Sequence, residues 1–521
     1  MQQTLQSTCQ QTNIPFAVGR ILRCRKSQTL MRTTSPKLET SHLTANDEAL
    51  LRCRNALELR DKGNYDGARE VMRPIWGGIG HRPETASLHP SVAAEVLLCA
   101  GILTGWIGSR NEIKEADEAA RDLITESVTI FESLGDLKKV AEARTELAYC
   151  YWRAGALDEA RIMFSEALQK LTIEGKTRAN ALLGLSVVEW SATRYDEALK
   201  ILIDNASLFN KITNHTLRGF YHNQLAMILR KLVTPENKTE QLNRVIDEYE
   251  QADSEFKLAR NTVFRAHVKN NIGNALRDLS RFRKAHEYLD HARRLTVNVR
   301  DKVRTAQVDE SRAQAFMAEQ KYAQAEVAAR HAVRSFEKAG RQCFLAEALI
   351  THGIALARLG KTVQAQFNFR KAIEVAHQAG ALNRAGIAAL TLIEEIDELS
   401  PEILLSAYEQ AGEWLSTSQS QEIFQRFKTA GKKLALKLRE GKVKGAPEVL
   451  FNQPRNVKQD LLSIEREMIR KALAEVNGSV THAASLLGMS YQGLAYLIKS
   501  RHPELLKERS PVRHRRYRKD Q

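Results

Sequence analysis

Apolar residues recur every three or four positions along most of this chain, which is the period of one face of an α-helix. Between about residues 47 and 397 one phrase returns: an aromatic or apolar residue, two spacers, alanine, and apolar residues four and seven positions further on. The clear copies begin at Tyr65, Leu157, Tyr195, Phe282, Tyr322 and Thr362. From Ala160 onward the alanines are separated by 38, 87, 40 and 40 residues, and weaker copies near Ala116 and Tyr249 fill the wider gaps. Repetition at this period predicts a solenoid of helical hairpins.

A different pattern lies between residues 477 and 499. Its apolar positions fall at helical spacing in two short runs, Val480, Ala483, Ala484 and Leu487, then Leu494, Leu497 and Ile498. Between the runs stand Gly488, which accepts the left-handed conformation that ends a helix, and Ser490, a residue type that begins one. Two short helices with a tight corner are therefore predicted, as in a helix-turn-helix whose second helix enters the major groove of DNA.

At these residues the sequence resembles the Fis-type (factor for inversion stimulation) DNA-binding domain. That family has Gly-Asn-Val-Thr-x-Ala-Ala-x-x-Leu-Gly-Ile-Ser, which is matched here from Gly478 to Ser490. Residues 464–473 resemble the helix that precedes the motif, and the resemblance extends over residues 461–505. The family's second helix usually carries arginine at its start and middle, but here the corresponding faces carry Tyr491, Gln492, Gly493 and Tyr496. The other interpretation of the pattern is an ordinary helical hairpin.

The repeats resemble the tetratricopeptide repeat. The best unit spans Ala266–Val299, with Gly273 where the two helices cross and Ala285 at the start of the second helix. Residues 141–167 and 346–372 match similarly. A spacing near 40 exceeds the usual 34 of the family, so longer helices or loops and about seven or eight repeats are expected. The resemblance implies that the first helix of each hairpin lines the concave face.

The expected fold class is therefore all-α, a tetratricopeptide-like solenoid followed by a small Fis-type helix-turn-helix domain. The predicted segments are a disordered arm over 1–45, the solenoid over 46–400, a helical capping segment over 401–440, a basic linker over 441–460, the helix-turn-helix over 461–508 and a basic disordered tail over 509–521.

Composition is consistent with this class, since the 521 residues include only 11 prolines and 6% aromatic residues. The six cysteines are scattered without a Cys-x-x-Cys pair, which argues against disulfides or a zinc site and favours the cytosol. No apolar run is expected to approach the roughly 20 residues that span a membrane. The N-terminus has no signal-peptide pattern.

The net charge of +16 is unevenly placed. Residues 428–444 carry +6, residues 499–521 another +6 and residues 1–45 carry +5, which leaves the rest close to neutral. Two of these basic segments flank the helix-turn-helix. Lysine and arginine beside a groove-reading motif indicate contacts with phosphates, although a solvated basic tail is the plainer interpretation of residues 499–521 taken alone.

No sequence pattern indicates catalysis or a cofactor. The chain lacks the phosphate-binding loop Gly-x-x-x-x-Gly-Lys-Ser/Thr, the Gly-x-Ser-x-Gly elbow and His-Glu-x-x-His. The histidine pairs His215/His222 and His286/His291 lack a further ligand at suitable spacing, so no metal site is expected. We expect a protein that is not an enzyme and binds no cofactor.

Two sets of candidate binding residues follow. In the C-terminal part, Gln492 has the amide geometry that recognises adenine, and tyrosine and cationic side chains can contact sugar and phosphate. The candidate DNA-binding residues are Thr481, His482, Ser490, Tyr491, Gln492, Gly493, Tyr496, Lys499, Arg501, Arg513, Arg515 and Arg516. In the solenoid, polar side chains on first helices are suited to hold a peptide backbone. The candidate peptide-binding residues are Asn223, Arg230, Asn270, Asn274 and Arg277.

Together these features predict a cytoplasmic, nucleoid-associated transcriptional regulator that binds double-stranded DNA in a sequence-specific way. The solenoid is expected to bind a protein or peptide or to mediate oligomerisation, and a homodimer on paired half-sites is expected, with no membrane involved. The alternative is a non-enzymatic adaptor scaffold whose helix-turn-helix makes protein contacts.

Overall fold

A computed structural model describes residues 43–111, 113, 115–416, 418, 420–440, 457–487, 489 and 491–508. These residues form helices and connecting turns, and no strand occurs among them. The chain divides into two units, Met1–Gly441 and Lys442–Gln521. The all-α class is thus confirmed, and each unit is described by itself.

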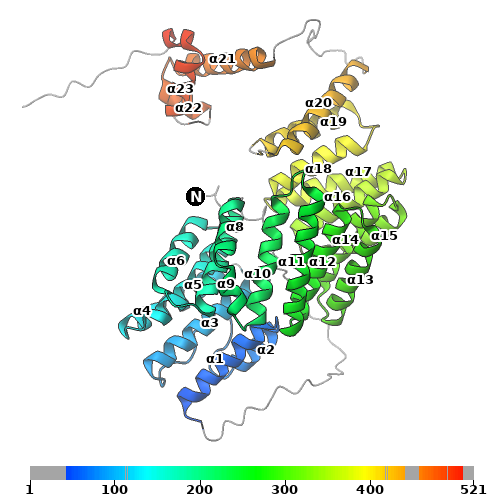
Figure 1. Ribbon diagram of the computed structural model, residues 1–521. Helices are drawn as coiled ribbons and strands as arrows, with labels where there is room; N and C mark the ends of the chain where they lie inside the picture. The colour runs from blue at the N-terminus through cyan, green and yellow to red at the C-terminus, as the bar shows by residue number, and fades with distance from the viewer. Residues whose placement is uncertain are drawn as a thin grey trace, which may run out of the picture. The chain divides into compact units, whose positions relative to one another are not determined.

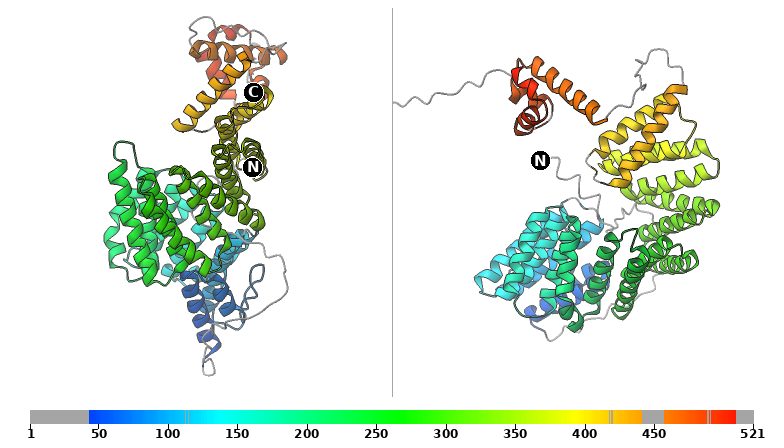
Figure 2. Two further views of the ribbon diagram at one scale, coloured as in Figure 1. Left: turned by 90° about the vertical axis from the view of Figure 1, so that its right-hand side faces the viewer. Right: turned by 45° about the horizontal axis from the view of Figure 1, so that its top comes forward.

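In the first unit, helices pack in consecutive antiparallel pairs (Figures 1 and 2). The first helices of the pairs are α1 (Ala45–Asp61), α3 (Pro90–Asn111), α5 (Leu137–Arg153), α7 (Lys176–Ser191), α10 (His215–Lys231), α12 (Thr262–Asp278), α14 (Lys302–Ala318), α16 (Gln342–Arg358) and α18 (Leu382–Glu395). Their partners are α2 (Tyr65–Met72), α4 (Ala116–Ser133), α6 (Leu157–Lys170), α8 (Tyr195–Asp204), α11 (Lys238–Leu258), α13 (Phe282–Asn298), α15 (Tyr322–Ala339), α17 (Thr362–Gln378) and α19 (Pro401–Leu415). The described residues thus form nine hairpins, with a short α9 (Ala206–Lys211) after α8 and α20 (Gln421–Glu440) packed on α18 and α19.

Each clear copy of the sequence phrase begins the second helix of a hairpin. Its alanine is fully buried at every copy, because a larger side chain would separate the paired helices. The period of 40 arises in the regular part, where α12, α13 and α14 each have 17 residues and three-residue turns join them. The middle residue of such turns is left-handed, as at Gly360 (φ 74°) and Ser280 (φ 57°).

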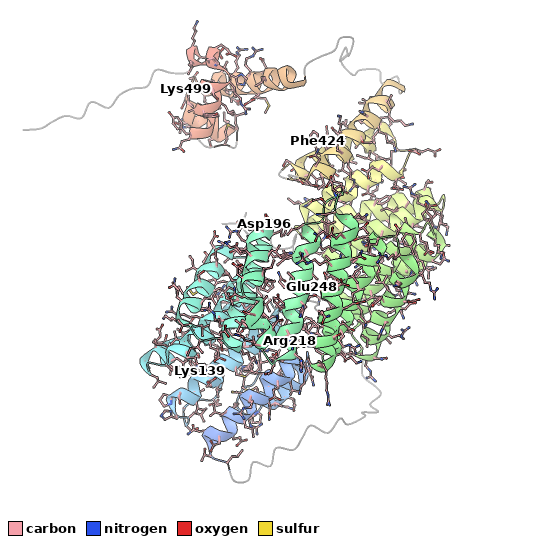
Figure 3. All side chains as sticks on the ribbon, viewed as in Figure 1. Lys139, Asp196, Arg218, Glu248, Phe424 and Lys499 are labelled. Carbon is pink, nitrogen blue, oxygen red and sulfur yellow. The ribbon has the colours of Figure 1, made fainter. Side chains whose placement is uncertain are left out.

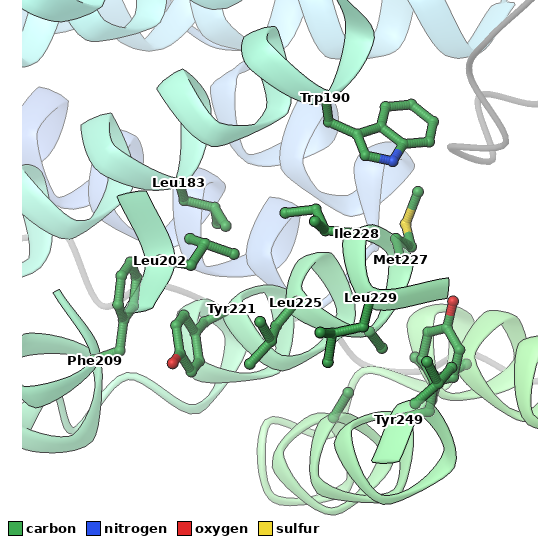
Figure 4. Close-up of a cluster of buried hydrophobic side chains, with 14 of the residues drawn as sticks. Leu183, Trp190, Leu202, Phe209, Tyr221, Leu225, Met227, Ile228, Leu229 and Tyr249 are labelled. Atoms are coloured by element: carbon green, nitrogen blue, oxygen red, sulfur yellow. The ribbon is translucent and has the colours of Figure 1, made fainter. Parts of the chain in front are cut away.

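Glycine allows the helices of a hairpin to cross closely. A Cβ atom on Gly273 would lie 2.6 Å from Leu289 Cγ, and one on Gly353 would lie 2.6 Å from Phe369 Cε1. The predicted role of Gly273 at a helix crossing agrees with this geometry. The largest apolar cluster continues from α7 to α13 and includes Trp190, Tyr221 and Tyr249 (Figure 4).

The solenoid meets itself after one superhelical turn. The Nδ2 group of Asn261, before α12, donates a hydrogen bond to the carbonyl oxygen of Asp61, at the end of α1, at 2.8 Å. Thr216 Oγ1 on α10 donates to the same oxygen at 3.5 Å. The first hairpin therefore contacts the fifth and sixth, although about 150 to 200 residues separate them in sequence.

Within the described ranges, α3 is long and apolar enough to cross a membrane, over Pro90–Arg110. The expectation that no apolar run approaches this length is wrong at α3. Of an 18-residue apolar window within this stretch, 78% is buried inside the protein. Its apolar character follows from its place in the core, where it packs against α1, α2 and α4.

The second unit contains α21 (Val457–Glu475), α22 (Val480–Leu486), α23 (Tyr491–Ser500) and the 3-10 helix η1 (Pro503–Lys507). Its small core is formed by Ile469, Ala472, Leu473, Ala483, Ala484, Leu494, Ile498 and Leu505. The alanines and leucines that the sequence pattern placed inward are thus buried or partly buried, and α22 packs on α23 as a helix-turn-helix.

Candidate nucleic-acid interface and solenoid ligand face

The corner before α22 is made by two consecutive left-handed residues, Asn477 (φ 52°) and Gly478 (φ 76°). The amide of Gly478 donates to the carbonyl of Leu473 at 2.7 Å, which closes the end of α21. Ser479 then occupies the N-cap position of α22, and its Oγ lies 2.9 Å from His482 Nδ1. This turn fixes the direction in which α22 leaves α21.

Ion pairs hold α21 against the segment that follows α23. Arg470 Nε lies 2.9 Å from Glu508 Oε1, and Arg501 Nη1 lies 3.3 Å from Glu465 Oε2. The buried ring of His502 lies 3.7 Å from the same Glu465 carboxylate. The pairs join residues about 36 to 38 positions apart and so support the three-helix arrangement with the apolar core.

One face of α23 is free of the core. Tyr491 is 52% exposed and Tyr496 67% exposed, and Gln492 and Lys499 are also exposed (Figure 3 labels Lys499). Leu494 and Ile498 are buried. Gln492, Tyr496 and Lys499 follow one another at i, i+4 and i+7 and form one row on the face away from these two residues, while Tyr491 is exposed at the first position of the helix. The row presents an amide, a phenol and an ammonium group, which are donors and acceptors suited to base edges and phosphates.

The other predicted DNA-binding residues lie around this row. Thr481 and His482 are exposed in the first turn of α22, Gly493 is half-buried, and Arg501 remains 53% exposed beside Glu465. Ser490, Arg513, Arg515 and Arg516 lie outside the described residues, as do Gly488, most of the expected basic linker and nearly all of the predicted N-terminal arm.

Part of the basic segment 428–444 serves the fold of the solenoid. Lys433 Nζ lies 2.8 Å from Asp397 Oδ1 and donates to the carbonyl oxygens of Ile393 and Ile396 at the end of α18. This cation is thus committed to a helix C-terminus, where positive charge is favourable.

The five candidate peptide-binding residues lie on α10 and α12, both first helices, as expected. Four of them form a polar row with α14. Arg230 pairs with Asp278 at 2.5 Å, Arg277 donates to Gln314 Oε1 at 2.6 Å, and Asn274 Nδ2 lies 3.3 Å from Ser311 Oγ. Asn270 is half-buried, and its Oδ1 atom has no hydrogen-bond partner. These side chains largely satisfy one another between adjacent helices.

Asn223, the remaining candidate peptide-binding residue, lines a cavity of about 260 Å³. The walls come from the first helices of the first seven hairpins, α1, α3, α5, α7, α10, α12 and α14, together with Tyr65 at the start of α2 and the cap residue Asn214 before α10. Its aromatic lining residues are Tyr65, Trp106, Tyr149, Trp152, Phe220 and Phe264. None of the six is among the residues predicted from sequence, although five of them stand on first helices, the elements expected to face inward.

Three of the four histidines in the two pairs have a carboxylate partner. His215 Nδ1 lies 2.8 Å from Glu255, His222 Nδ1 lies 2.8 Å from Glu248, and His286 Nε2 lies 2.9 Å from Glu319. Across the described ranges, no cluster of three or more histidine, cysteine or acidic side chains has a metal-binding arrangement.

Comparison with known proteins locates one family. Residues 461–499 match the model of the bacterial regulatory protein, Fis family. No curated protein sequence matches the chain.

Solved structures similar to the solenoid include a signal-transduction ATPase with numerous domains from Pyrococcus horikoshii that has a tetratricopeptide repeat sensor (15% identity, TM-score 0.46). The match covers 70% of this chain but only 55% of that one. A Rap protein complexed with competence and sporulation factor has 15% identity and a TM-score of 0.43, with 67% of this chain and 100% of that chain covered. Yeast Tom70 has 14% identity and a TM-score of 0.40, with 75% and 85% covered.

Proposed function

This chain joins a tetratricopeptide-like solenoid to a C-terminal helix-turn-helix domain of the Fis family of bacterial regulatory proteins, and we propose that it is a sequence-specific, DNA-binding transcriptional regulator without enzymatic activity. The solenoid serves as its protein- or peptide-binding or oligomerisation module. It acts in the cytoplasm on nucleoid DNA.

The observation that carries the proposal is the exposed row on α23. Gln492, Tyr496 and Lys499 are exposed on one side of the helix, where an amide, a phenol and an ammonium group can contact base edges and phosphates. Leu494 and Ile498 are buried and anchor the helix to the core of the second unit. A second helix held this way can enter a major groove with its outer face toward the bases.

The side chains on that row suggest distinct roles. Gln492 reads adenine because its side-chain amide can accept a hydrogen bond from N6 of the base and donate one to N7. Tyr491, Tyr496, Thr481 and Lys499 contact phosphate and sugar, which fixes the register of the helix on the duplex. Arg513, Arg515 and Arg516 supply sequence-independent attraction to phosphates.

A single unit of this size reads few base pairs, so the proposed active form is a homodimer on two half-sites. The polar row that contains Asn270, Asn274 and Arg277 is the proposed peptide-binding face. On binding a peptide, these side chains would give up the hydrogen bonds that they now make between helices and would bond the backbone amide and carbonyl groups of the peptide instead.

The test uses full-length protein and duplexes selected from a random library, with binding followed by fluorescence anisotropy. Replacing Gln492 with Ala should lower affinity for the selected site by about 1–3 kcal/mol and leave affinity for unrelated duplexes unchanged. The matched control is Gln364→Ala, an exposed glutamine on α17 of the solenoid, which should change neither.

The arginine cluster separates affinity from specificity. Replacing Arg513, Arg515 and Arg516 together with glutamine should weaken binding to every duplex and reduce the slope of log affinity against log salt by roughly one for each lost phosphate contact. Equal losses on all duplexes from both sets of changes would remove Gln492 as a reader. Negligible, salt-insensitive affinity of the unmodified protein would instead support the adaptor scaffold.

A further inference from the structure

Two neighbouring hairpins carry exposed apolar side chains on their second helices. On α17, Val363 is 81% exposed and Phe367 is 66% exposed, and on α15 Val327 is 55% exposed. Val363 and Phe367 are four positions apart, so they lie on one face of α17. Val327 occupies in α15 the position that Phe367 occupies in α17, one period of 40 residues later. Isolated exposed apolar residues are ordinary, whereas a group of them marks an interaction site.

This apolar group borders a groove between α15 and α17, two helices on the same side of the first unit (Figure 1). Val363 and Phe367 line the groove from α17, and Glu326 and Arg330 line it from α15. Leu356 of α16 contributes a buried apolar side chain to the lining. The groove therefore combines apolar walls with a charged edge.

Polar contacts hold the three helices around the groove in place. His352 on α16 lies between the other two helices, with its Nε2 atom 3.2 Å from Glu326 Oε1 on α15 and its Nδ1 atom 3.2 Å from Asn368 Oδ1 on α17. Lys371 Nζ on α17 lies 2.8 Å from Glu337 Oε1 on α15. The groove is thus already formed without a partner, which reduces the cost of binding one.

Cations continue the exposed stripes beyond the apolar residues. Arg334 and Lys338 follow on α15, Arg370 follows on α17, and Lys361 precedes α17. All four residues are exposed, and within the described part of the chain none of them has a carboxylate at ion-pair distance. Glu374 adds one opposing charge on α17. The cations are therefore available to a partner that carries negative charge.

The basic character belongs to this part of the solenoid. Segments 281–300, 321–340 and 361–380, each of which is a second helix with its cap and the turn after it, carry +4, +2 and +2. The corresponding segment around α4, residues 115–135, carries −5. A solenoid whose net charge is close to zero thus has an acidic second helix in an early hairpin and basic ones in the later hairpins.

This combination of surface properties selects one kind of partner. Phosphates of DNA would pair with the cations and leave the apolar group in water, whereas an acidic amphipathic helix covers both. The longest segments outside the described ranges, 1–42, 441–456 and 509–521, carry +5, +2 and +5, so the cations would repel them. The acidic helix α4 of a second copy already buries its apolar face in its own solenoid.

We propose that the groove between α15 and α17 is a docking site for an acidic amphipathic helix of another protein. The apolar face of that helix packs on Val327, Val363 and Phe367, and its carboxylates pair with Arg334 and Arg370. The groove lies on second helices and is separate from the polar row on first helices that is proposed to bind peptide. The proposal holds whether or not the second unit binds DNA.

The test measures binding of a fluorescein-labelled peptide to the full-length protein by fluorescence anisotropy. The peptide has about 18 residues, long enough to form an isolated helix, with leucine along one face and glutamate on the other. It should bind at least about tenfold more tightly than the same peptide with lysine in place of glutamate. A glutamate–leucine peptide of equal composition, shuffled so that no apolar face forms, should also bind at least about tenfold more weakly.

Variants of exposed residues test the location without disturbing the core. Phe367→Ser and Arg370→Glu should each lower the affinity for the glutamate peptide about tenfold, because each removes a contact in or beside the groove. The matched controls are Ile162→Ser, 54% exposed on α6, and Arg54→Glu, exposed on α1, which should leave the affinity unchanged. Circular dichroism verifies that each variant is folded.

Absence of binding by the glutamate peptide, equal binding of the lysine or shuffled peptide, or equal losses in the control variants would overturn the proposal. Two further results would overturn it by identifying another occupant. If Arg370→Glu weakened binding to duplex DNA and Phe367→Ser did not weaken peptide binding, the surface would contact phosphates. If Phe367→Ser converted a dimer to a monomer in sedimentation velocity without peptide, the groove would hold a second copy of the chain.

Discussion

At the scale of single residues, the solenoid contains ionisable groups that burial keeps from their ordinary charge state. Glu310 on α14 is only 8% exposed and accepts hydrogen bonds from Thr351 Oγ1 at 2.5 Å and Gln314 Nε2 at 3.1 Å. Burial raises the pKa of its carboxyl group to about 7, because two neutral donors do not replace the lost solvent. Burial likewise lowers the pKa of His267 to about 3, so this histidine stays neutral at physiological pH.

The raised pKa of Glu310 makes stability depend on pH. The folded state retains a proton that the unfolded state loses above about pH 4.5, so the free energy of unfolding falls as pH rises towards 7 and then levels off. Between pH 5 and 8 we expect the unmodified protein to lose about 2–3 kcal/mol relative to Glu310→Gln, which has no such proton. Urea unfolding at the two pH values measures this difference. The exposed Glu159→Gln should show no such trend, and a pH-independent difference for Glu310→Gln would contradict the assignment.

At the scale of helices, the phrase that repeats in the sequence coincides with the start of the second helix of each hairpin that carries it. It stands where a second helix begins, with its alanine against the first helix and a left-handed residue two positions upstream, as at Gly155 before Leu157. The regular hairpins α12 to α17 were therefore predictable from sequence. The helices between Ala198 and Ala285 were less predictable from sequence, because the short α9 and the 21-residue α11 interrupt the regular period there.

The helix crossings supply a direct test of this packing. Gly353→Ala places a methyl group against Phe369, so we expect a loss of about 1–3 kcal/mol in the free energy of unfolding. Denaturation by urea, followed by circular dichroism, measures the loss. The matched change Gly175→Ala adds its methyl group in open space at the start of α7 and should cost only a few tenths of a kcal/mol. Equal effects of both changes would show that close approach is not what requires glycine at 353.

At the scale of the first unit, closure of the superhelical turn depends on few polar contacts. Asn261 has two functions there: its Oδ1 caps α12 by accepting from the amide of Phe264 at 3.0 Å, and its Nδ2 donates to Asp61. Asn214 caps α10 in the same way, at 2.8 Å from the amide of Leu217, and its side chain makes no long-range hydrogen bond. Both residues cap a helix, but only Asn261 also bonds to the first hairpin, so comparing variants of the two distinguishes the effect of capping from the effect of closure.

Asn261→Asp keeps the cap but replaces the donor with a carboxylate beside the Asp61 carbonyl. We expect a destabilisation of the closure by about 1–3 kcal/mol, because buried acceptors then face each other. Hydrogen exchange measured by mass spectrometry should show faster exchange in α1 and unchanged exchange in α16 to α18. Asn214→Asp should leave α1 unaffected. If both variants had the same exchange pattern, the turn would be held by apolar packing rather than by this bond.

Sequence by itself determined the helical class, the hairpin period and the helix-turn-helix, because these depend on local spacing of apolar, small and turn residues. It also identified the exposed row on α23, since inward and outward positions of a short helix alternate with a known period. Only the tertiary structure decided which polar side chains remain available. Arg277 and Arg230 are engaged by neighbouring helices, whereas Arg110 and Gln224 face a cavity that exists because hairpins far apart in the chain meet. Such contacts depend on the accumulated rotation from hairpin to hairpin, which no local sequence pattern contains.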